Sequence, residues 1–201
     1  MIRFLLIRHG NTDLSGRVLY GRMPGLHLNE DGRKQARALA QAIKEKYVLS
    51  EIISSPLERA LETARPIAEA QNIALTIDEG IAEIDFGLWM GKSFEELRDQ
   101  EDWRAYNRRR ATHWPPGGES MMDVQARAWR SIQKALHRHA GRGETTLAFV
   151  THGDVIRAVL LLLLGIPADH IQRLEISTAS VTEVLAGPHD PVVRSVNQIL
   201  D

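Results

Sequence analysis

The chain has 201 residues, of which 43% are hydrophobic and 25% charged, and these proportions are those of an ordinary globular protein. Its formal net charge of −1 provides no broad field that would attract DNA or an anionic membrane. The absence of cysteine excludes disulfides, thiolate metal sites and a cysteine nucleophile. We therefore expect one domain over residues 1–201, with no nucleic-acid partner and no membrane partner.

The first half of the chain predicts alternating strands and helices. An almost continuous apolar run over residues 2–7 is typical of a strand buried on both faces, and it is too short for a signal sequence. The elements that follow are a loop over 17–28, a helix capped by Asn29, a strand over 51–54, a helix to about Gln71 and a strand over 73–77. We expect Ser55 to cap the second of these helices, with Pro56 in its first position and Glu58 completing a capping box.

The second half begins less regularly. The elements that we expect there are an aromatic, glycine-containing segment over 84–91, one polar helix over 94–110, a long helix capped by Ser120, a buried strand over 147–151, an apolar helix over 155–166, and two strands over 180–185 and 192–196 joined by a turn at 187–190. Arg157 interrupts the apolar helix, which is well short of the ~20 residues that a membrane span needs. We therefore expect a cytoplasmic location.

Strands and helices in this order favour an α/β fold, namely a three-layer α/β/α sandwich with a mostly parallel central sheet. We expect a small helical cap insertion at about 84–118. Ligands of such folds bind outside the carboxyl ends of the strands, so side chains at strand ends are the first candidates for a functional site.

Two predicted strands end alike, with His9-Gly10 and with His152-Gly153. His9 alone could be a base, a metal ligand, a nucleophile, or simply a histidine that satisfies nearby backbone groups. Parallel neighbouring strands would bring both imidazoles to one pocket, where the glycines allow the backbone to approach a ligand closely. The N-terminus of the helix after His152 would face the same pocket, and the pair of histidines therefore favours a ligand site.

Two arginines indicate the charge of that ligand. Arg8 adjoins His9, and Arg59 lies in the first turn of the helix that follows the second strand. Two guanidinium groups and two imidazoles at one helix N-terminus repel each other unless an anion binds, and phosphate oxygens suit guanidinium donors. For Arg59 alone, an ion pair with Glu58 or Glu62 along its helix is the alternative.

Five motifs occur in order along nearly the whole chain. They are Arg8-His9-Gly10-Asn11-Thr12, SSPLERALETA over 54–64, EIDFGLWMG over 83–91, Pro116-Gly117-Gly118-Glu119-Ser120 and Thr151-His152-Gly153. With these motifs the chain resembles the histidine phosphatase superfamily, in its phosphoglycerate-mutase-like branch.

The resemblance implies a role for each candidate residue. His9 would be the nucleophile that becomes phosphohistidine, and Glu83 would be the general acid. The residues alone do not separate Glu83 from Asp78, Glu79 and Asp85, or from an ordinary surface carboxylate. The residues that would bind the phosphate or the substrate are Arg8, Asn11, Ser15, Arg22, Arg59, His152 and Gly153.

Two of these positions depart from the family pattern. Many members carry asparagine at the position of Ser15, where it touches the phosphate, and a hydroxyl could still donate there. The family often has aspartate in the loop that contains Arg22. Arg22 could meet a second anionic group of the substrate, or it could be a solvated loop residue.

The resemblance and the predicted pocket together imply a cofactor-independent phosphatase that hydrolyses small phosphomonoesters, with a small phosphorylated metabolite as its partner. The resemblance implies no cofactor. No metal site is expected either, since His137 and His139 are two apart on a helix and do not share a face. A homodimer is left open. The alternatives are a phosphoglycerate mutase, which in this family has a longer segment between the acid and the second histidine, and a non-catalytic phospho-ligand sensor, which predicts the loss of His9 or Glu83.

Overall fold

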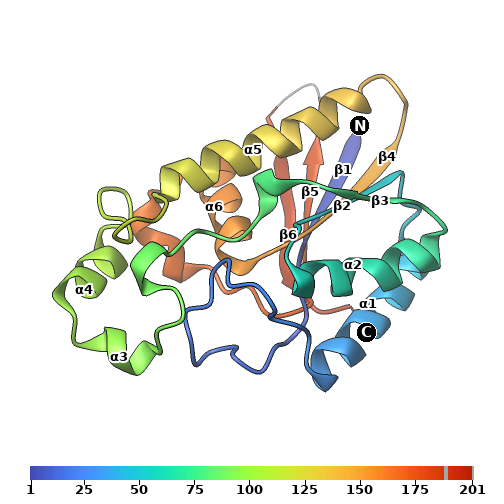
Figure 1. Cartoon of the computed structure of the whole chain (residues 1–201). Helices are drawn as coiled ribbons and strands as arrows, with labels where there is room; N and C mark the ends of the chain where they lie inside the picture. The colour runs from blue at the N-terminus through green and yellow to red at the C-terminus, as the bar shows by residue number, and fades with distance from the viewer. Residues whose placement is uncertain (188–189, 201) are drawn as a thin grey trace.

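The computed structural model describes residues 1–187 and 190–200 (Figure 1). The strands are β1 (Ile2–Arg8), β2 (Glu51–Ser54), β3 (Leu75–Ile77), β4 (Thr145–Thr151), β5 (Val181–Ala186) and β6 (Val192–Gln198). The α-helices are α1 (Glu30–Lys46), α2 (Glu58–Gln71), α3 (Phe94–Arg98), α4 (Glu101–Arg108), α5 (Met121–Arg138) and α6 (Gly153–Leu164). Short 3-10 helices lie at Glu79–Ile81, Gly87–Trp89 and Ala168–Arg173.

The strands form one mixed sheet in the order β3-β2-β4-β1-β5-β6. The pairs β2–β3, β2–β4 and β1–β4 are parallel, whereas β5 runs antiparallel to β1 and to β6. The predicted α/β fold with a mostly parallel sheet is therefore confirmed. The predicted turn at 187–190 includes Pro188 and His189, which lie outside the described residues.

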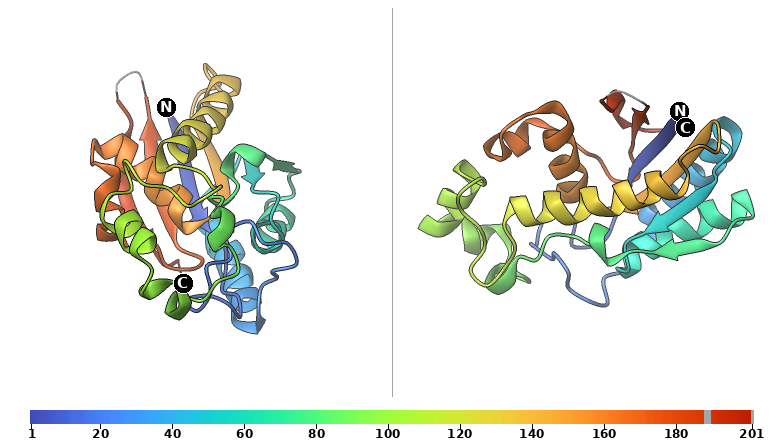
Figure 2. Two further views of the ribbon diagram at one scale, coloured as in Figure 1. Left: turned by 60° about the vertical axis from the view of Figure 1, so that its left-hand side comes forward. Right: turned by 90° about the horizontal axis from the view of Figure 1, so that it is seen from above.

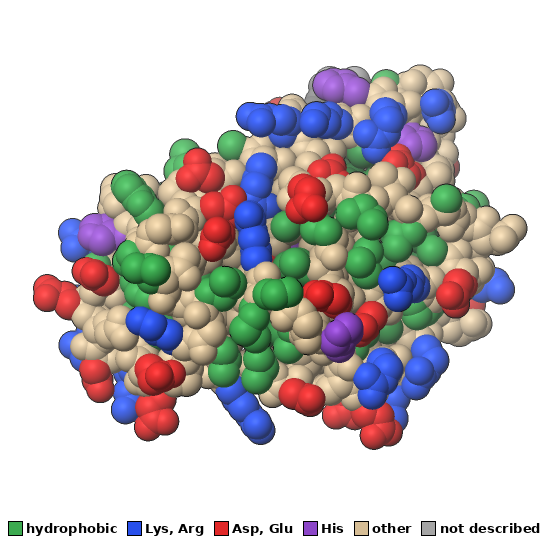
Figure 3. Space-filling view, in the orientation of Figure 1, with side chains coloured by type: hydrophobic (Ala, Val, Ile, Leu, Met, Phe, Trp, Pro, Cys, Tyr) green, Lys and Arg blue, Asp and Glu red, His purple; other side chains and the backbone are tan. Residues whose placement is uncertain are grey.

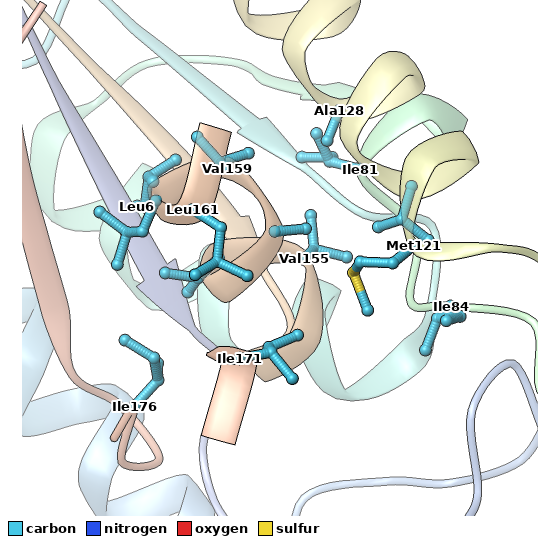
Figure 4. Close-up of a cluster of buried hydrophobic side chains, with 14 of the residues drawn as sticks. Leu6, Ile81, Ile84, Met121, Ala128, Val155, Val159, Leu161, Ile171 and Ile176 are labelled. Carbon is cyan, nitrogen blue, oxygen red and sulfur yellow. The ribbon is translucent and has the colours of Figure 1, made fainter. Parts of the chain in front are cut away.

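The side chains of β1 show why the sheet is covered on both faces. Successive side chains of a strand point to opposite faces. Leu5 and Ile7 pack in one apolar cluster with residues of α1 and α2, whereas Phe4 and Leu6 pack in another with residues of α5 and α6. The two pairs of helices flank the sheet in Figure 2, and Figure 4 shows Leu6 beside side chains of α6. This double burial explains the continuous apolar run that begins the sequence.

The caps of the two longest helices agree with the sequence analysis. Asn29 caps α1 by accepting a hydrogen bond from the N–H of Gly32 at 2.8 Å. Ser120 caps α5 and forms a reciprocal capping box with Asp123. Each such cap satisfies backbone donors that the first helical turn leaves free.

The prediction of one helix over 94–110 is wrong. The chain forms α3 and α4 there, and α3 has its own capping box between Ser93 and Glu96. The side chain of Arg104 stabilises the interruption between the two helices, because its Nε donates to the carbonyl of Arg98 and its Nη2 to the Asp99 carboxylate, each at 3.0 Å. These local acceptors compete with continuous helical pairing.

The two short helices belong to residues 84–118, the expected cap insertion, and they lie at one end of the molecule beyond the strands (Figure 1). The ring centroid of Trp89 lies 5.4 Å from that of Trp103 and 5.3 Å from that of Tyr106, both in edge-on contacts that favour packing. That this segment acts as a cap stays a prediction. Within the described residues, no helix is long and apolar enough to cross a membrane.

The leucine run in α6 offers a matched test of the core. Leu160 is completely buried, whereas Leu162 is 43% exposed. Leu160→Ala should lower the free energy of unfolding by about 2–5 kcal/mol, because it removes transfer energy and leaves a cavity. Leu162→Ala should lower it by much less, and equal effects in urea denaturation would contradict the packing.

Candidate active site

The register of three parallel strands brings the predicted site residues together. Arg8 of β1 pairs with Thr151 of β4, and Ser54 of β2 pairs with Val150 of β4. One residue further along, the N–H of His9 donates to the carbonyl of Thr151 at 3.0 Å. The strand ends therefore meet at one edge of the sheet, where the imidazole centroids of His9 and His152 are 5.2 Å apart.

His9 is buried and has a defined arrangement of ring nitrogens. Its Nδ1 lies 2.7 Å from the carbonyl oxygen of Gly10, which can only accept, so we assign the proton to Nδ1. Nε2 then carries the lone pair of the ring, and this lone pair accepts a hydrogen bond from Nε of Arg59 at 3.3 Å. Burial, and then the charges of Arg59 and Arg8, lower the pKa of His9 well below its ordinary value. His9 is therefore a neutral imidazole with an available nucleophilic nitrogen.

Ser55 defines the protonation of the second histidine. Its Oγ lies 2.7 Å from Nε2 of His152 and accepts a hydrogen bond from the N–H of Leu57 at 3.3 Å. We assign the Ser55 hydroxyl as the donor to Nε2, which places the proton of His152 on Nδ1; this nitrogen is buried and has no partner among the described residues. Burial, followed by the charge of Arg59, lowers the pKa of His152, so the ring is neutral.

The predicted capping box at the start of α2 is wrong. The helix begins only at Glu58, with Leu57 in the N-cap position and no side-chain cap. The Ser55 hydroxyl lies two residues before that position, where it contacts the N–H of Leu57 and the ring of His152. The Glu58 carboxylate accepts from the N–H of Gly25 at 2.9 Å instead. Ser55 lies at a strand end as predicted, and its contact with His152 is a site interaction that the sequence did not indicate.

The two arginines are held by backbone carbonyls. Nη1 of Arg8 donates to the carbonyl of Ile176 at 2.5 Å, and Nη2 of Arg59 donates to that of Gly21 at 2.7 Å. The guanidinium of Arg59, which is fully buried, also lies over the ring of Tyr20, 4.9 Å from its centroid. Among the described ion pairs, Arg59 is joined to neither Glu58 nor Glu62, so the alternative of an ion pair along its helix does not hold.

Three buried nitrogens of this group have no hydrogen-bond partner among the described residues: Nε of Arg8, Nη1 of Arg59 and Nδ1 of His152. An unpaired buried donor costs about 1–3 kcal/mol. Three such donors at one edge of the sheet indicate a site built for an anion with several oxygens.

Glu83 lines a cavity of about 220 Å³ together with Arg8 and Gly153. Burial, and then the nearby charge of Asp154, raise the pKa of Glu83 to about 7. The competing carboxylates do not line this cavity. Those of Asp78 and Asp85 accept from the N–H groups of Gly80 and Gly87, and Glu79 is exposed. Glu83 is therefore a carboxyl group that can hold a proton near neutral pH and release it.

Asp154 is a site residue that the sequence analysis missed. Burial opposes its charge, but Arg110 and Arg157 outweigh that effect and hold the pKa of Asp154 below its ordinary value. Arg157 donates to it at 3.0 Å and Arg110 at 3.4 Å. Asp154 thus stays ionised and favours the protonated form of Glu83.

The remaining candidates lie beside the cavity rather than along it. Ser15 Oγ bonds to Thr12 Oγ1 at 3.0 Å and to its N–H at 3.2 Å. The N–H of Asn11 donates to Gln35 at 2.9 Å. Arg22 donates to the carbonyl of Glu83 at 2.7 Å. None of the three lines the cavity, and their contact with a substrate stays a prediction. The buried side chains of His9, Arg59 and His152 do not line it either, whereas their neighbours Arg8, Gly21 and Gly153 do.

Aromatic side chains form the outer wall of the site. Tyr20, Phe86 and Phe94 line the cavity, and a second space of about 430 Å³ shares Phe86, Phe94 and Asp154 with it. On the face in Figure 3, hydrophobic side chains gather near the middle while charges of both signs are interspersed around them. Within the described part of the chain, no group of three His, Cys, Asp or Glu could hold a metal ion.

Comparisons with known proteins agree with this geometry. A model of the histidine phosphatase superfamily (branch 1) matches residues 4–199. A bifunctional protein of Mycobacterium tuberculosis is 34% identical over 90% of this chain, which spans only 49% of that protein. Phosphoserine phosphatase 1 of Hydrogenobacter thermophilus is 31% identical, covering 98% of this chain and 92% of its own. The structure of mycobacterial glucosyl-3-phosphoglycerate phosphatase with VO3 has a TM-score of 0.86 and 30% identity, covering 97% of this chain and 98% of that one.

The hydrogen bond between Ser55 and His152 leads to a test by anion binding. Ser55→Ala should weaken the binding of inorganic phosphate roughly tenfold or more, because a hydrogen bond to a charged group contributes about 1.5–3 kcal/mol and Nδ1–H would no longer be fixed as a donor. Isothermal titration calorimetry measures the effect. Ser54→Ala is the matched control, since Ser54 Oγ donates only to the carbonyl of Ser55. Equal affinities for the two variants would contradict the assigned role.

Proposed function

Because the chain belongs to the histidine phosphatase superfamily, we propose that it hydrolyses small phosphomonoesters through a phosphohistidine formed at Nε2 of His9. The observation that carries this proposal is the set of three unpaired buried N–H donors, from Arg8, Arg59 and His152, beside a neutral imidazole. A dianionic phosphoryl group supplies the acceptors that these donors lack.

In the first step, the Nε2 lone pair of His9 attacks phosphorus and the bond to the ester oxygen breaks. Arg59 turns its Nε from His9 to a phosphoryl oxygen, and Arg8 and His152 donate to the others, so that developing charge is stabilised where it forms. Glu83 gives its proton to the departing oxygen, and the product is a neutral alcohol.

In the second step, water attacks the phosphorus of the phosphohistidine. Glu83, now ionised, takes a proton from this water, while the N–P bond breaks and its electron pair returns to Nε2 of His9. Inorganic phosphate leaves, and both residues regain their initial protonation states. One carboxyl group thus serves both steps, which a pKa of about 7 favours at neutral pH.

The shape of the site supports a small phosphorylated metabolite as substrate. With the phosphoryl group among Arg8, Arg59 and His152, the alcohol part would lie against Phe86 and Phe94. Phosphoserine and glucosyl-3-phosphoglycerate, which the relatives' names specify, are natural members of a test panel. Release of phosphate from this panel, compared with interconversion of 2- and 3-phosphoglycerate, separates a phosphatase from a mutase.

Removal of the nucleophile tests the covalent step. His9→Ala should reduce phosphate release to background and abolish acid-labile labelling of the enzyme by a radioactive phosphomonoester, because no other side chain provides the attacking nitrogen. His137→Ala, in which an exposed histidine of α5 is removed, should leave both unchanged. Turnover in His9→Ala at the wild-type rate would exclude this mechanism and would leave a non-catalytic or different use of the pocket.

The pH dependence tests Glu83. For an alkyl monoester, kcat/KM should rise as the substrate passes its second ionisation near pH ~6 and fall as pH increases through about 7, because deprotonated Glu83 cannot donate. Glu83→Gln should lower kcat/KM by about 10²–10⁴ and remove the descending limb. A wild-type rate that keeps increasing well above neutral pH would show that the acid is another group.

A further inference from the structure

Glu119, in the loop before α5, collects donors from three separate parts of the chain. Its carboxylate accepts from Nη2 of Arg22 at 2.8 Å, from Nε and Nη2 of Arg127 at 3.0 Å each, and from the backbone N–H of Asp85 at 3.0 Å. Arg127 belongs to the long helix α5. The carboxylate therefore ties the segment around residue 85 to a rigid helix and to the N-terminal loop.

The same two guanidinium groups bind the backbone just before Asp85. Arg22 donates through Nε to the carbonyl of Glu83 at 2.7 Å, and Arg127 donates to that carbonyl through Nη2 at 3.1 Å. Arg127 also donates through Nη1 to the carbonyls of Gly80 and Ala82, at 2.9 and 2.6 Å. The backbone of Glu83 is thus fixed at two points. Charged donors bind its own carbonyl, and Glu119 binds the N–H of Asp85, two residues further along the chain.

The segment that carries Glu83 lies outside regular secondary structure, although Ile84 is fully buried and the N–H of Glu119 donates to the carbonyl of Asp85 at 2.9 Å. The 3-10 helix before it ends at Ile81, and the next one begins only at Gly87. No strand ladder and no helical pairing is present between these two among the described residues. Burial of Ile84 holds the segment against the core, and the charge-assisted contacts of Arg22, Arg127 and Glu119 are the strongest hydrogen bonds that fix its backbone.

From this arrangement we infer that Glu119 is a positioning residue for the general acid: with Arg127 and Arg22 it forms a clamp on the Glu83 backbone that sets where the Glu83 carboxyl stands. The inference rests on the proposed function, in which Glu83 protonates the leaving oxygen. A proton donor must be held to within about 0.5 Å of its productive position, so a relaxed clamp lowers protonation without removing the acid.

The leaving group distinguishes this role from a general structural one. An alkoxide needs a proton to leave, whereas p-nitrophenolate is a weak base that leaves without one. Glu119→Gln should therefore lower kcat/KM for an alkyl monoester about 10–100-fold and that for p-nitrophenyl phosphate by less than about threefold, a weaker form of the Glu83→Gln pattern. Arg127→Lys, which keeps the charge but loses the fork of donors, should give the same pattern. Glu79→Gln, at an exposed position in the same segment, is the control and should change neither value.

A double-mutant cycle completes the test. If Glu119 acts through Glu83, adding Glu119→Gln to Glu83→Gln should change kcat/KM for the alkyl ester by less than about twofold. Equal losses for both leaving groups in Glu119→Gln and in Arg127→Lys, or additive effects in the cycle, would overturn the clamp while the phosphatase mechanism stands. Absence of leaving-group discrimination in Glu83→Gln itself would overturn the proposed role of Glu83 first.

Discussion

β4 lies between β1 and β2, and its backbone register with both decides which side chains emerge at the same edge of the sheet. His9, Ser55 and His152 all follow directly from strands in this triplet, and the N–H groups of His9 and Ser55 donate to carbonyls of β4 at 3.0 and 2.9 Å. A slip by one residue would turn each strand's side chains to the opposite face. The apolar alternation that fills the two helix-facing cores excludes such a slip, and it therefore also sets where the side chains of the candidate site emerge.

The burial of like charges at this edge is the second constraint. Burial, and then the charges of nearby arginines, lower the pKa of both imidazoles, so His9 and His152 stay neutral beside two cations. Burial, and then the ionised Asp154, raise the pKa of Glu83 to about 7. The protein thus sets the protonation of His9 and Glu83 by environment rather than by residue type.

The features that could be predicted from the sequence are those that depend on contacts between residues close together in the chain. Asn29 and Ser120 were predictable caps because their partners lie three residues away, and the apolar runs of the strands carried the fold. Ser55 was predicted as a cap by the same local rule, whereas its hydroxyl contacts His152, which is 97 residues distant. The contacts of Glu119 with Arg22 and of Asp154 with Arg110 are likewise long-range, and no spacing indicates them. The direction of β5 and β6 was also hidden, because the alternation of side chains is the same in parallel and antiparallel strands.

Phe86 and Phe94 line both the cavity beside Glu83 and the second space next to it. Two different parts of the chain would therefore contact the two parts of a substrate. In the proposed reaction, the phosphoryl group would be bound by residues on strand ends and on the first turn of a helix, whose positions depend on the whole core. The alcohol would be contacted by side chains of the segment between Glu83 and α5, where Phe86 is buried in the core and Phe94 is 38% exposed. Exchange of Phe94 would therefore alter the contact with the alcohol at little cost to the core, so that the substrate can change while the reaction stays the same.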